Sequence, residues 1–347
     1  MYIKRILLGI ALVGLIGGGI FAYIVFGTFF TPNTNFNNDE AIVFIPSNAS
    51  ISDLEERLAP LLGDFSSFKS AADRKGYLSN IKPGRYKIAK GMNNNEIVNS
   101  LRSGNLPVKV SFNNQESIND LAGRIASQIE ADSVSLVAAF DDKEFLKANG
   151  FDDDNKISLY IPNSYEFFWN TSAEGFRGRM LKEYNRFWTD TRKEKSSALG
   201  LKPNEVIALA SIVHKETAKV DERPTVAGVY LNRLRKGMLL QADPTVIYAI
   251  KKETGNYDTI IKRVLYRDLE MDSPYNTYKY AGLPPGPIAM PDITAIDAVL
   301  NPKKHNYYYF VANVEKFGYH MFAENLTQHN RNKEQYIRWI NAQKINR

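Results

Sequence analysis

The chain has 347 residues, of which 44% are hydrophobic and 24% are charged, and this composition suits two or three small folded domains. The formal net charge of +6 is mildly basic, but Lys and Arg are interleaved with Asp and Glu, so nucleic-acid binding is not expected. The sequence contains no cysteine, which excludes disulfides, thiolate metal sites and a cysteine nucleophile.

The first thirty residues predict a transmembrane helix. Lys4 and Arg5 precede an uncharged and mostly apolar run over residues 6–30, which is long enough for a bilayer core of about 20 residues. A cleavable signal peptide has a shorter apolar region and a small-residue cleavage site, and no clean site of that kind precedes Thr31. Because positive charge favours the cytoplasmic side, we expect a single-pass anchor in the plasma (inner) membrane, with the remaining chain outside the cytoplasm.

An internal repeat follows a polar, Asn-rich segment at residues 31–40, which we interpret as a linker. The pattern S-I-x-D-L-x-x-R begins at Ser50 and again at Ser117. Each copy follows a β-like run, at residues 41–45 and 108–112, and leads into helical sequence, a Gly-aromatic pair and a second helical segment. Chance similarity between two ordinary capped helices is the alternative, but several features recur in the same order.

The repeat predicts the same helix start twice. Ser50 and Ser117 are typical N-cap residues, and Asp53 and Asp120 follow at the third helical position, where a carboxylate faces free backbone amides. We therefore predict two small βα modules, which occupy residues 41–105 and 106–185.

From residue 186 to the end, the sequence predicts a mainly helical domain, so the expected fold class is α+β. Pro203 and Pro224 each stand just inside a helix start, and Asp243 before a proline is typical of a helix cap. A Pro/Gly stretch at residues 282–287 predicts a rigid loop, which we expect to shape a groove wall. The chain is expected to close with a hairpin at residues 307–312 and 319–322 and a helix at 327–341.

Metal, nucleotide and serine-hydrolase chemistry find no support in the sequence. The four histidines show no metal-ligand spacing, no Gly-rich phosphate loop is present, and Ser211 lacks a nucleophile-elbow context. Carboxylate chemistry remains. On a helix over residues 204–217, a rotation of about 100° per residue places Glu216 beside an apolar stripe that includes Leu209 and Ile212.

Glu216 has two equally good interpretations from this spacing alone. A carboxyl held against apolar groups has a raised pKa, which suits a general acid. A glutamate near a helix end, where the stripe simply meets solvent, explains the same spacing.

Several collinear motifs resemble the YceG-like family of endolytic murein transglycosylases. They are A-L-A-S-I-V-H-K-E-T from Ala208, V-A-G-V-Y-L-N-R-L from Val226, L-Q-A-D-P-T-V-I-Y from Leu240, Y-N-T-Y from Tyr275 and G-L-P-P-G-P-I-A from Gly282. The run K-P-G-R-Y from Lys82 resembles the family's LysM-like segment, which implies that the first small module is LysM-like.

The resemblance implies that Glu216 is the catalytic residue, because the family's catalytic glutamate directly precedes Thr or Ala in this motif. Many members carry Glu where this chain has His214, which indicates that an acid at that position is dispensable. The chain also has Asn163 where the family commonly has Asp, which argues against an essential acid there.

The resemblance further implies cleavage of the β-1,4 bond between N-acetylmuramic acid and N-acetylglucosamine, with a 1,6-anhydro end as product and no cofactor or metal. The muramyl 6-hydroxyl attacks its own C1, so one residue can serve as acid and then as base, whereas enzymes that use water need two carboxylates. The family alone implies peptidoglycan synthases as partners and the termination of nascent strands.

Four further residues are candidates for binding sugar hydroxyls and acetamido groups, although a helix cap is the favoured role of Asp243, and loop hydrogen bonds or core packing explain the others at least as well. They are Gln241, Asp243, Asn276 and Tyr278. Two other functions stay open, a muramidase that uses water on the same substrate and a non-catalytic glycan-binding scaffold for peptidoglycan synthases.

Overall fold

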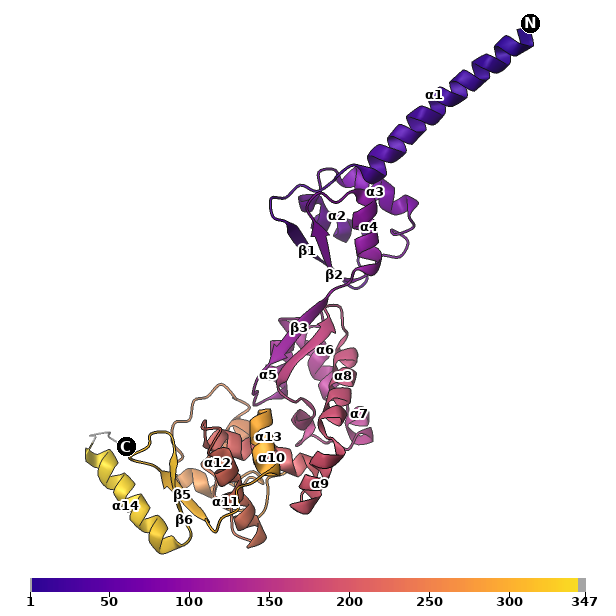
Figure 1. The fold of residues 1–347 in the computed structure, drawn as a ribbon. Helices are drawn as coiled ribbons and strands as arrows, with labels where there is room; N and C mark the ends of the chain where they lie inside the picture. Colours follow the sequence, from indigo (N-terminus) through magenta and orange to yellow (C-terminus); the bar gives the residue numbers. More distant parts are fainter. Residues whose placement is uncertain (1, 343–347) are drawn as a thin grey trace. The chain divides into compact units, whose positions relative to one another are not determined.

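The computed structural model describes residues 2–342, which form two compact units (Figure 1). The first unit contains the chain up to Val110 together with Gln128–Ala131 and Tyr165–Ser172, and the second contains the remainder. The fold is mainly helical, with small two-stranded sheets. This division by contacts does not follow the domain boundaries expected from the sequence, which stay a prediction.

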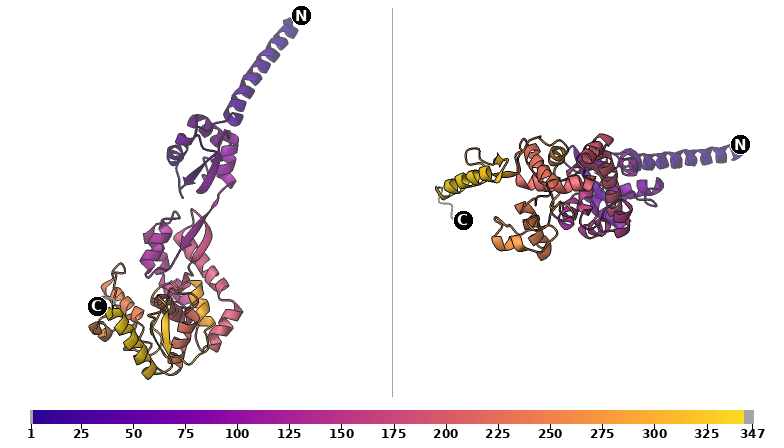
Figure 2. Two further views of the ribbon diagram at one scale, coloured as in Figure 1. Left: turned by 60° about the vertical axis from the view of Figure 1, so that its left-hand side comes forward. Right: turned by 90° about the horizontal axis from the view of Figure 1, so that it is seen from below.

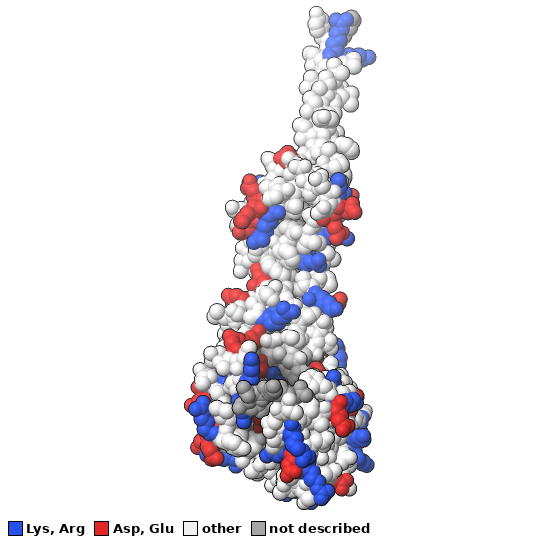
Figure 3. Space-filling model, turned by 90° about the vertical axis from the view of Figure 1, so that its left-hand side faces the viewer, with Lys and Arg blue, Asp and Glu red and all other residues white. Residues whose placement is uncertain are grey.

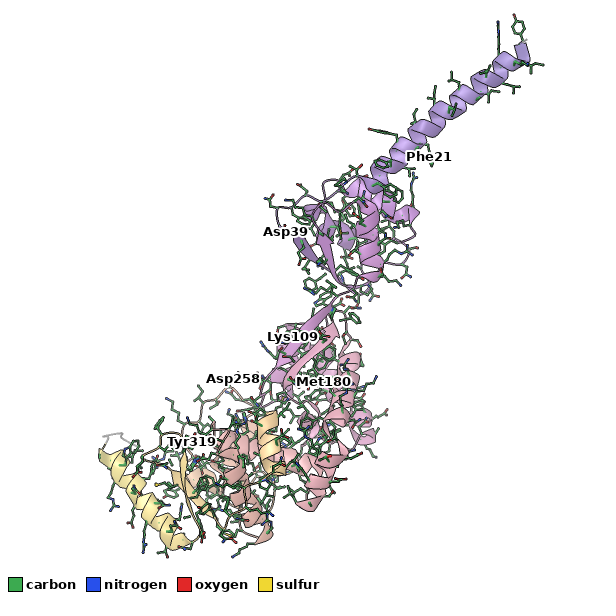
Figure 4. All side chains as sticks on the ribbon, in the orientation of Figure 1. Phe21, Asp39, Lys109, Met180, Asp258 and Tyr319 are labelled. Atoms are coloured by element: carbon green, nitrogen blue, oxygen red, sulfur yellow. The ribbon has the colours of Figure 1, made fainter. Side chains whose placement is uncertain are left out.

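The first unit begins with α1 (Tyr2–Phe30), a long apolar helix with no buried side chain. Among the described residues it is the one helix long and apolar enough to cross a membrane. Figure 3 shows α1 as an uncharged helix with Lys and Arg at its start, whereas both signs of charge are intermixed on the surface of the folded parts. The side chain of Phe21 projects from this helix in Figure 4. This helix is therefore a candidate single-pass anchor.

In the first small module, three helices pack against a two-stranded sheet. Its strands β1 and β2 are antiparallel, with Glu40 opposite Ala89 and Ile45 opposite Gly84. Their inward side chains, such as Val43 and Ile88, join the helices in one buried core. The elements are β1 (Glu40–Ile45), α2 (Ile51–Leu58), the 3-10 turn η1 (Ala59–Leu61), α3 (Phe65–Arg74), β2 (Gly84–Ala89) and α4 (Asn94–Ser103).

The segment interpreted as a linker is hydrogen-bonded to this module. The backbone N–H of Asn33 donates to the carbonyl of Met92 at 2.9 Å, and its side-chain amide donates to Asn94 Oδ1 at 2.7 Å. Asn94 in turn donates to the carbonyl of Thr28 in α1 at 2.8 Å. Asn33 and Asn94 are both buried, so these bonds fix the connection between α1 and the module.

The element order of the repeat recurs downstream, with one added helix. Ser50 Oγ accepts from the N–H of Asp53 at 3.2 Å, and Ser117 Oγ accepts from the N–H of Asp120 at 3.1 Å, which confirms both predicted N-caps. Strand β3 pairs with β4. The second set is β3 (Pro107–Phe112), α5 (Ile118–Ala126), α6 (Ser133–Phe140), α7 (Lys143–Ala148), the 3-10 turn η2 (Lys156–Leu159), β4 (Asn163–Phe168) and α8 (Ala173–Phe187).

The rest of the second unit is built around α10 (Pro203–Glu216), in which every residue from Val206 to Val213 is buried. This helix contacts α11, α12 and α13, while α14 packs on the β5–β6 hairpin. The yellow helix α14 can be followed in Figure 2. The predicted hairpin and closing helix are confirmed. The elements are α9 (Asp190–Ala198), α11 (Arg223–Arg235), α12 (Asp243–Thr254), η3 (Tyr266–Glu270), α13 (Ile293–Leu300), β5 (Tyr309–Ala312), β6 (His320–Ala323) and α14 (Leu326–Ala342).

The Pro/Gly loop packs against α10 and the preceding module. Just after this loop, the N–H of Ile288 donates to Ser211 Oγ at 3.0 Å. Gly286 lies so close to the backbone of Asp154 that a Cβ there would come within 1.9 Å of its carbonyl oxygen. Because only glycine lacks a Cβ, only glycine allows the two backbones to lie this close. This packing explains why position 286 is a glycine without giving it a role in chemistry.

Candidate active site

Glu216 is the last residue of α10, and its half-buried side chain lines a cavity of about 270 Å³. The buried stretch of α10 fixes the direction in which this helix end points. The carboxyl therefore belongs to a cavity wall, which favours the first of the two interpretations of its spacing. The full lining is Glu216, Tyr230, Arg233, Leu240, Gln241, Asp243, Tyr278, Phe310 and His329.

The carboxyl of Glu216 is held by one strong hydrogen bond. The hydroxyl of Tyr230, a fully buried residue of α11, donates to Glu216 Oε1 at 2.6 Å. Burial raises the pKa of Glu216 to about 7, although this hydrogen bond and the nearby charges of His320 and Arg233 act in the opposite direction. A carboxyl that titrates near neutral pH can both give and take a proton there.

Three of the four predicted binding residues meet at this cavity. Gln241 precedes α12 in a left-handed backbone conformation, with φ of 49°, and its N–H donates to the carbonyl of Thr277 at 3.0 Å. Tyr278 follows Thr277, and its hydroxyl donates to Asp243 Oδ1 at 2.5 Å. A non-glycine residue at positive φ is strained, and the bond to Thr277 holds Gln241 at the cavity in that conformation.

One sequence-based role is corrected, and for Asn276 the structure shows the loop hydrogen bonds that were one of its two interpretations. Asp243 makes no side-chain cap of α12, because it is the first residue of that helix and its carboxylate is bonded to Tyr278 instead. Asn276 is fully buried and outside the cavity lining, and its side-chain amide donates to the carbonyls of Leu269 and Met271. Asn276 therefore shapes the loop that carries Tyr278.

The Pro/Gly loop lines another cavity, of about 420 Å³, through Pro284 and Pro285. None of residues 282–287 lines the cavity around Glu216, whose walls come instead from α10, α11, α14, the start of α12 and the hairpin. From the first strand of the hairpin, Phe310 lines the cavity, whereas Tyr309 does not.

Arg233 ties three parts of the site together and was not predicted. Its Nε donates to the carbonyl of Tyr308 at 2.6 Å, and its Nη1 donates to the carbonyl of Leu240 at 2.8 Å. The side chain is buried, so these backbone acceptors satisfy a charge that would otherwise be costly. Tyr230 and Arg233 stand three residues apart on α11, a spacing that puts both on one helix face and that the sequence could have revealed.

His329 of α14 also lines the cavity and was not predicted. Its ring stacks on Tyr309, with centroids 5.2 Å apart, and its buried Nδ1 has no hydrogen-bond partner among residues 2–342. Burial and the charges of Lys333 and Arg233 lower the pKa of His329. A proton on Nδ1 would have no acceptor, so the neutral ring carries its proton on Nε2.

Two carboxylates hold the elements around the site. Glu222, at the start of α11, is buried and accepts from the backbone N–H of His320 at 2.7 Å and bonds its Nδ1 at 2.9 Å. Asp292 caps α13 through the N–H of Ala295 and pairs with Arg223 at 2.6 Å. Among residues 2–342, no group of three or more His, Asp or Glu could hold a metal ion.

Comparison with known proteins identifies the family. The model of the YceG-like family matches residues 43–335. The chain belongs to the YceG-like family. The family resemblance drawn from the motifs is thereby confirmed.

Relatives and a solved structure agree with this assignment. The chain is 32% identical over 312 residues to an endolytic murein transglycosylase of Bacillus subtilis, with 84% of each chain covered. It is 28% identical to an endolytic murein transglycosylase of Streptococcus pneumoniae. That alignment covers 93% of this chain but only 63% of the relative, less than two thirds of the relative's length. A crystal structure of a yceG-like protein from Listeria monocytogenes is 29% identical, with a TM-score of 0.55, and covers 85% of this chain and 99% of that one.

Proposed function

We propose that this YceG-like chain is a membrane-anchored endolytic lytic transglycosylase of peptidoglycan, in which Glu216 is the catalytic residue. One observation carries the proposal, namely the carboxyl of Glu216 held by Tyr230 in a polar cavity, where burial raises its pKa to about 7. The relatives named endolytic murein transglycosylases support the substrate class.

In the proposed reaction, Glu216 first protonates the oxygen of the bond between N-acetylmuramic acid and N-acetylglucosamine. The bond from muramyl C1 to this oxygen breaks, and C1 takes on oxocarbenium character. The muramyl 6-hydroxyl then attacks C1, and its proton passes to the Glu216 carboxylate, so the residue is restored and no water is consumed. The products are a free 4-hydroxyl and a 1,6-anhydro end.

The neighbours of Glu216 have separate parts in this proposal. Tyr230 fixes Oε1, which directs Oε2 toward the bound sugar. Gln241 and Tyr278 offer polar groups to the sugar's hydroxyls and acetamido groups, and Phe310 gives an apolar wall. Because Arg233 satisfies backbone carbonyls, its role is to hold this wall and the loop before Gln241 in place.

A muramidase that uses water is the second candidate, and the cavity gives a specific reason to test it. Asp243 places a second carboxylate in the same cavity as Glu216, and an enzyme that activates water needs two such groups. The mass of the product separates the two candidates, because an anhydro end is one water lighter than a reducing end.

We also propose that α1 anchors the chain with its N-terminus in the cytoplasm and the cavity outside, and that the small modules are LysM-like and bind glycan. Peptidoglycan synthases are the proposed partners, with termination of nascent strands as the cellular role. The direct test of the function is digestion of defined nascent strands by the wild type and by Glu216→Gln. Cleavage by the wild type alone supports the proposal, whereas unchanged cleavage by the variant refutes it and no cleavage by the wild type favours the scaffold.

A further inference from the structure

A second cavity, of about 610 Å³, adjoins the one that holds Glu216. The two share the side chains of Asp243, Tyr278 and His329, so a ligand in the first cavity has direct access to the second. We name the second cavity the α14 groove, and its outer lining includes Arg263, Leu265, Tyr266, Lys333, Tyr336 and Ile337. It has more than twice the volume of the first, which suits a substituent of several residues.

The α14 groove carries positive charge that has no ion-pair partner among residues 2–342. Arg263 and Lys333 line it from opposite elements, the segment before η3 and helix α14, and neither has an ion pair with another of the described residues. The acidic residue of this lining is Asp243, whose carboxylate is bonded to Tyr278. The groove therefore suits an anionic ligand.

The same groove exposes apolar surface. Tyr266 is 86% exposed, and Leu265 and Ile337 are 41% and 42% exposed. Exposed large apolar side chains that gather beside a cavity are typical of a binding site, and those scattered singly are not. A ligand that combines carboxylates with short apolar side chains would satisfy both features of this lining.

We propose that the α14 groove binds the stem peptide that substitutes the muramyl residue cleaved at Glu216, with Arg263 and Lys333 pairing with its carboxylates. This inference rests on the proposed function, because the muramyl sugar occupies the adjoining cavity. The lactyl group of that sugar carries the peptide, and the peptide combines free carboxylates with alanine methyl groups. The enzyme thus selects peptide-bearing strands over strands stripped of peptide.

The test compares two substrates on the full-length protein in detergent. Strands that carry stem peptides and the same strands after enzymatic removal of the peptides are digested, and kcat/KM is measured for each. The wild type is expected to favour peptide-bearing strands about three- to tenfold, the range that two exposed ion pairs give, and to lose part of this preference at high salt. The double variant Arg263→Gln/Lys333→Gln is expected to reduce the preference toward one.

A matched control removes the same charge from the same elements outside the groove. Lys262→Gln/Arg338→Gln is expected to keep the wild-type preference, because neither side chain lines the groove. Equal cleavage of both substrates by the wild type, or a preference that survives in Arg263→Gln/Lys333→Gln, overturns the inference.

Binding separates a failure of this inference from a failure of the proposed function. Full-length Glu216→Gln is titrated with peptide-bearing and with stripped strands, which requires no turnover. We expect Glu216→Gln to bind peptide-bearing strands more tightly than stripped strands, and adding Arg263→Gln/Lys333→Gln to abolish this difference. That result supports peptide binding in the α14 groove even if the wild type cleaves neither substrate. Equal binding of both strands rejects the groove, whatever the activity of the wild type.

Discussion

The hydroxyl of Tyr230 lies 2.6 Å from Oε1 of Glu216, and this hydrogen bond joins α11 to the end of α10 in the wall of the cavity. It favours the ionised carboxyl, whereas burial favours the protonated one, and burial has the larger effect. The working state of Glu216 therefore depends on the balance between one hydrogen bond and the surrounding protein.

The first prediction concerns the pH profile. Glu216 must be protonated to act as the acid, so kcat/KM for strand cleavage is expected to fall as the pH rises through about 7. Tyr230→Phe removes a bond that lowers the pKa of Glu216, so the alkaline limb should move to higher pH. Rate measurements between about pH 5 and 9 test this, and a limb that stays in place or moves down would contradict it.

The second prediction concerns stability. The folded state raises the pKa of Glu216 from 4.5 to about 7, so the folded protein binds more protons than the unfolded one between these values. The wild type therefore loses stability as the pH rises through this window. Glu216→Gln cannot ionise, and we expect it to be about 1 to 3 kcal/mol more stable than the wild type at alkaline pH, with a smaller difference in acid. Urea unfolding on both sides of the window checks this, and a less stable variant at alkaline pH would refute it.

The third prediction concerns Asp292. Burial would raise the pKa of its carboxyl, but hydrogen bonds from His214, Arg223 and Thr294 hold the pKa well below its ordinary value. Asp292→Asn keeps a cap for α13 and leaves Arg223 buried without its counter-charge. We expect it to reduce the free energy of unfolding by about 2 to 4 kcal/mol at neutral pH.

The pH dependence of this loss identifies its cause. Because the folded pKa of Asp292 is lowered, its stabilisation is present above the ordinary value of 3.8 and fades below it. The difference between wild type and Asp292→Asn should therefore shrink in acid. A difference that is independent of pH would assign the effect to packing alone.

The fourth prediction concerns His329. His329→Phe keeps the stack on Tyr309 and removes the ring nitrogens of a residue that lines the cavity, so kcat/KM is expected to fall about tenfold with little change in thermal stability. His305→Phe is the control, because His305 bonds the carbonyl of Thr225 and the N–H of Tyr307. That change should lower stability instead. The ¹⁵N spectrum of the wild-type imidazole should show a bare Nδ1, and a protonated Nδ1 would contradict the assigned tautomer.

Local sequence patterns predicted the parts of the fold that depend on near neighbours. The two serine caps, α10 with its proline start, the hairpin and the closing helix all depend on residues within a few positions of one another. These features are local, so the sequence contains the information that decides them. The same helical period placed Glu216 beside the apolar stripe of α10, but it left open whether the carboxyl faces a cavity or solvent.

The rest of the site depends on contacts between distant segments. Asp243 looked like a cap because a proline follows it, but its carboxylate is bonded to Tyr278, 35 positions away. Asn276 was open to two interpretations, sugar binding and loop hydrogen bonds, and the turn around it uses its whole side-chain amide. His329 enters the cavity only because α14 packs on the hairpin, and no nearby residue signals that packing.

Digestion of uniform nascent glycan strands by the wild type and by Glu216→Gln, followed by mass measurement of the fragments, decides whether Glu216 cleaves the strand without water. We expect fragments with 1,6-anhydro ends, one water lighter than reducing ends, from the wild type and none from the variant. Fragments with reducing ends would assign the chemistry to water and a second carboxylate, and anhydro fragments from Glu216→Gln would remove Glu216 from the reaction.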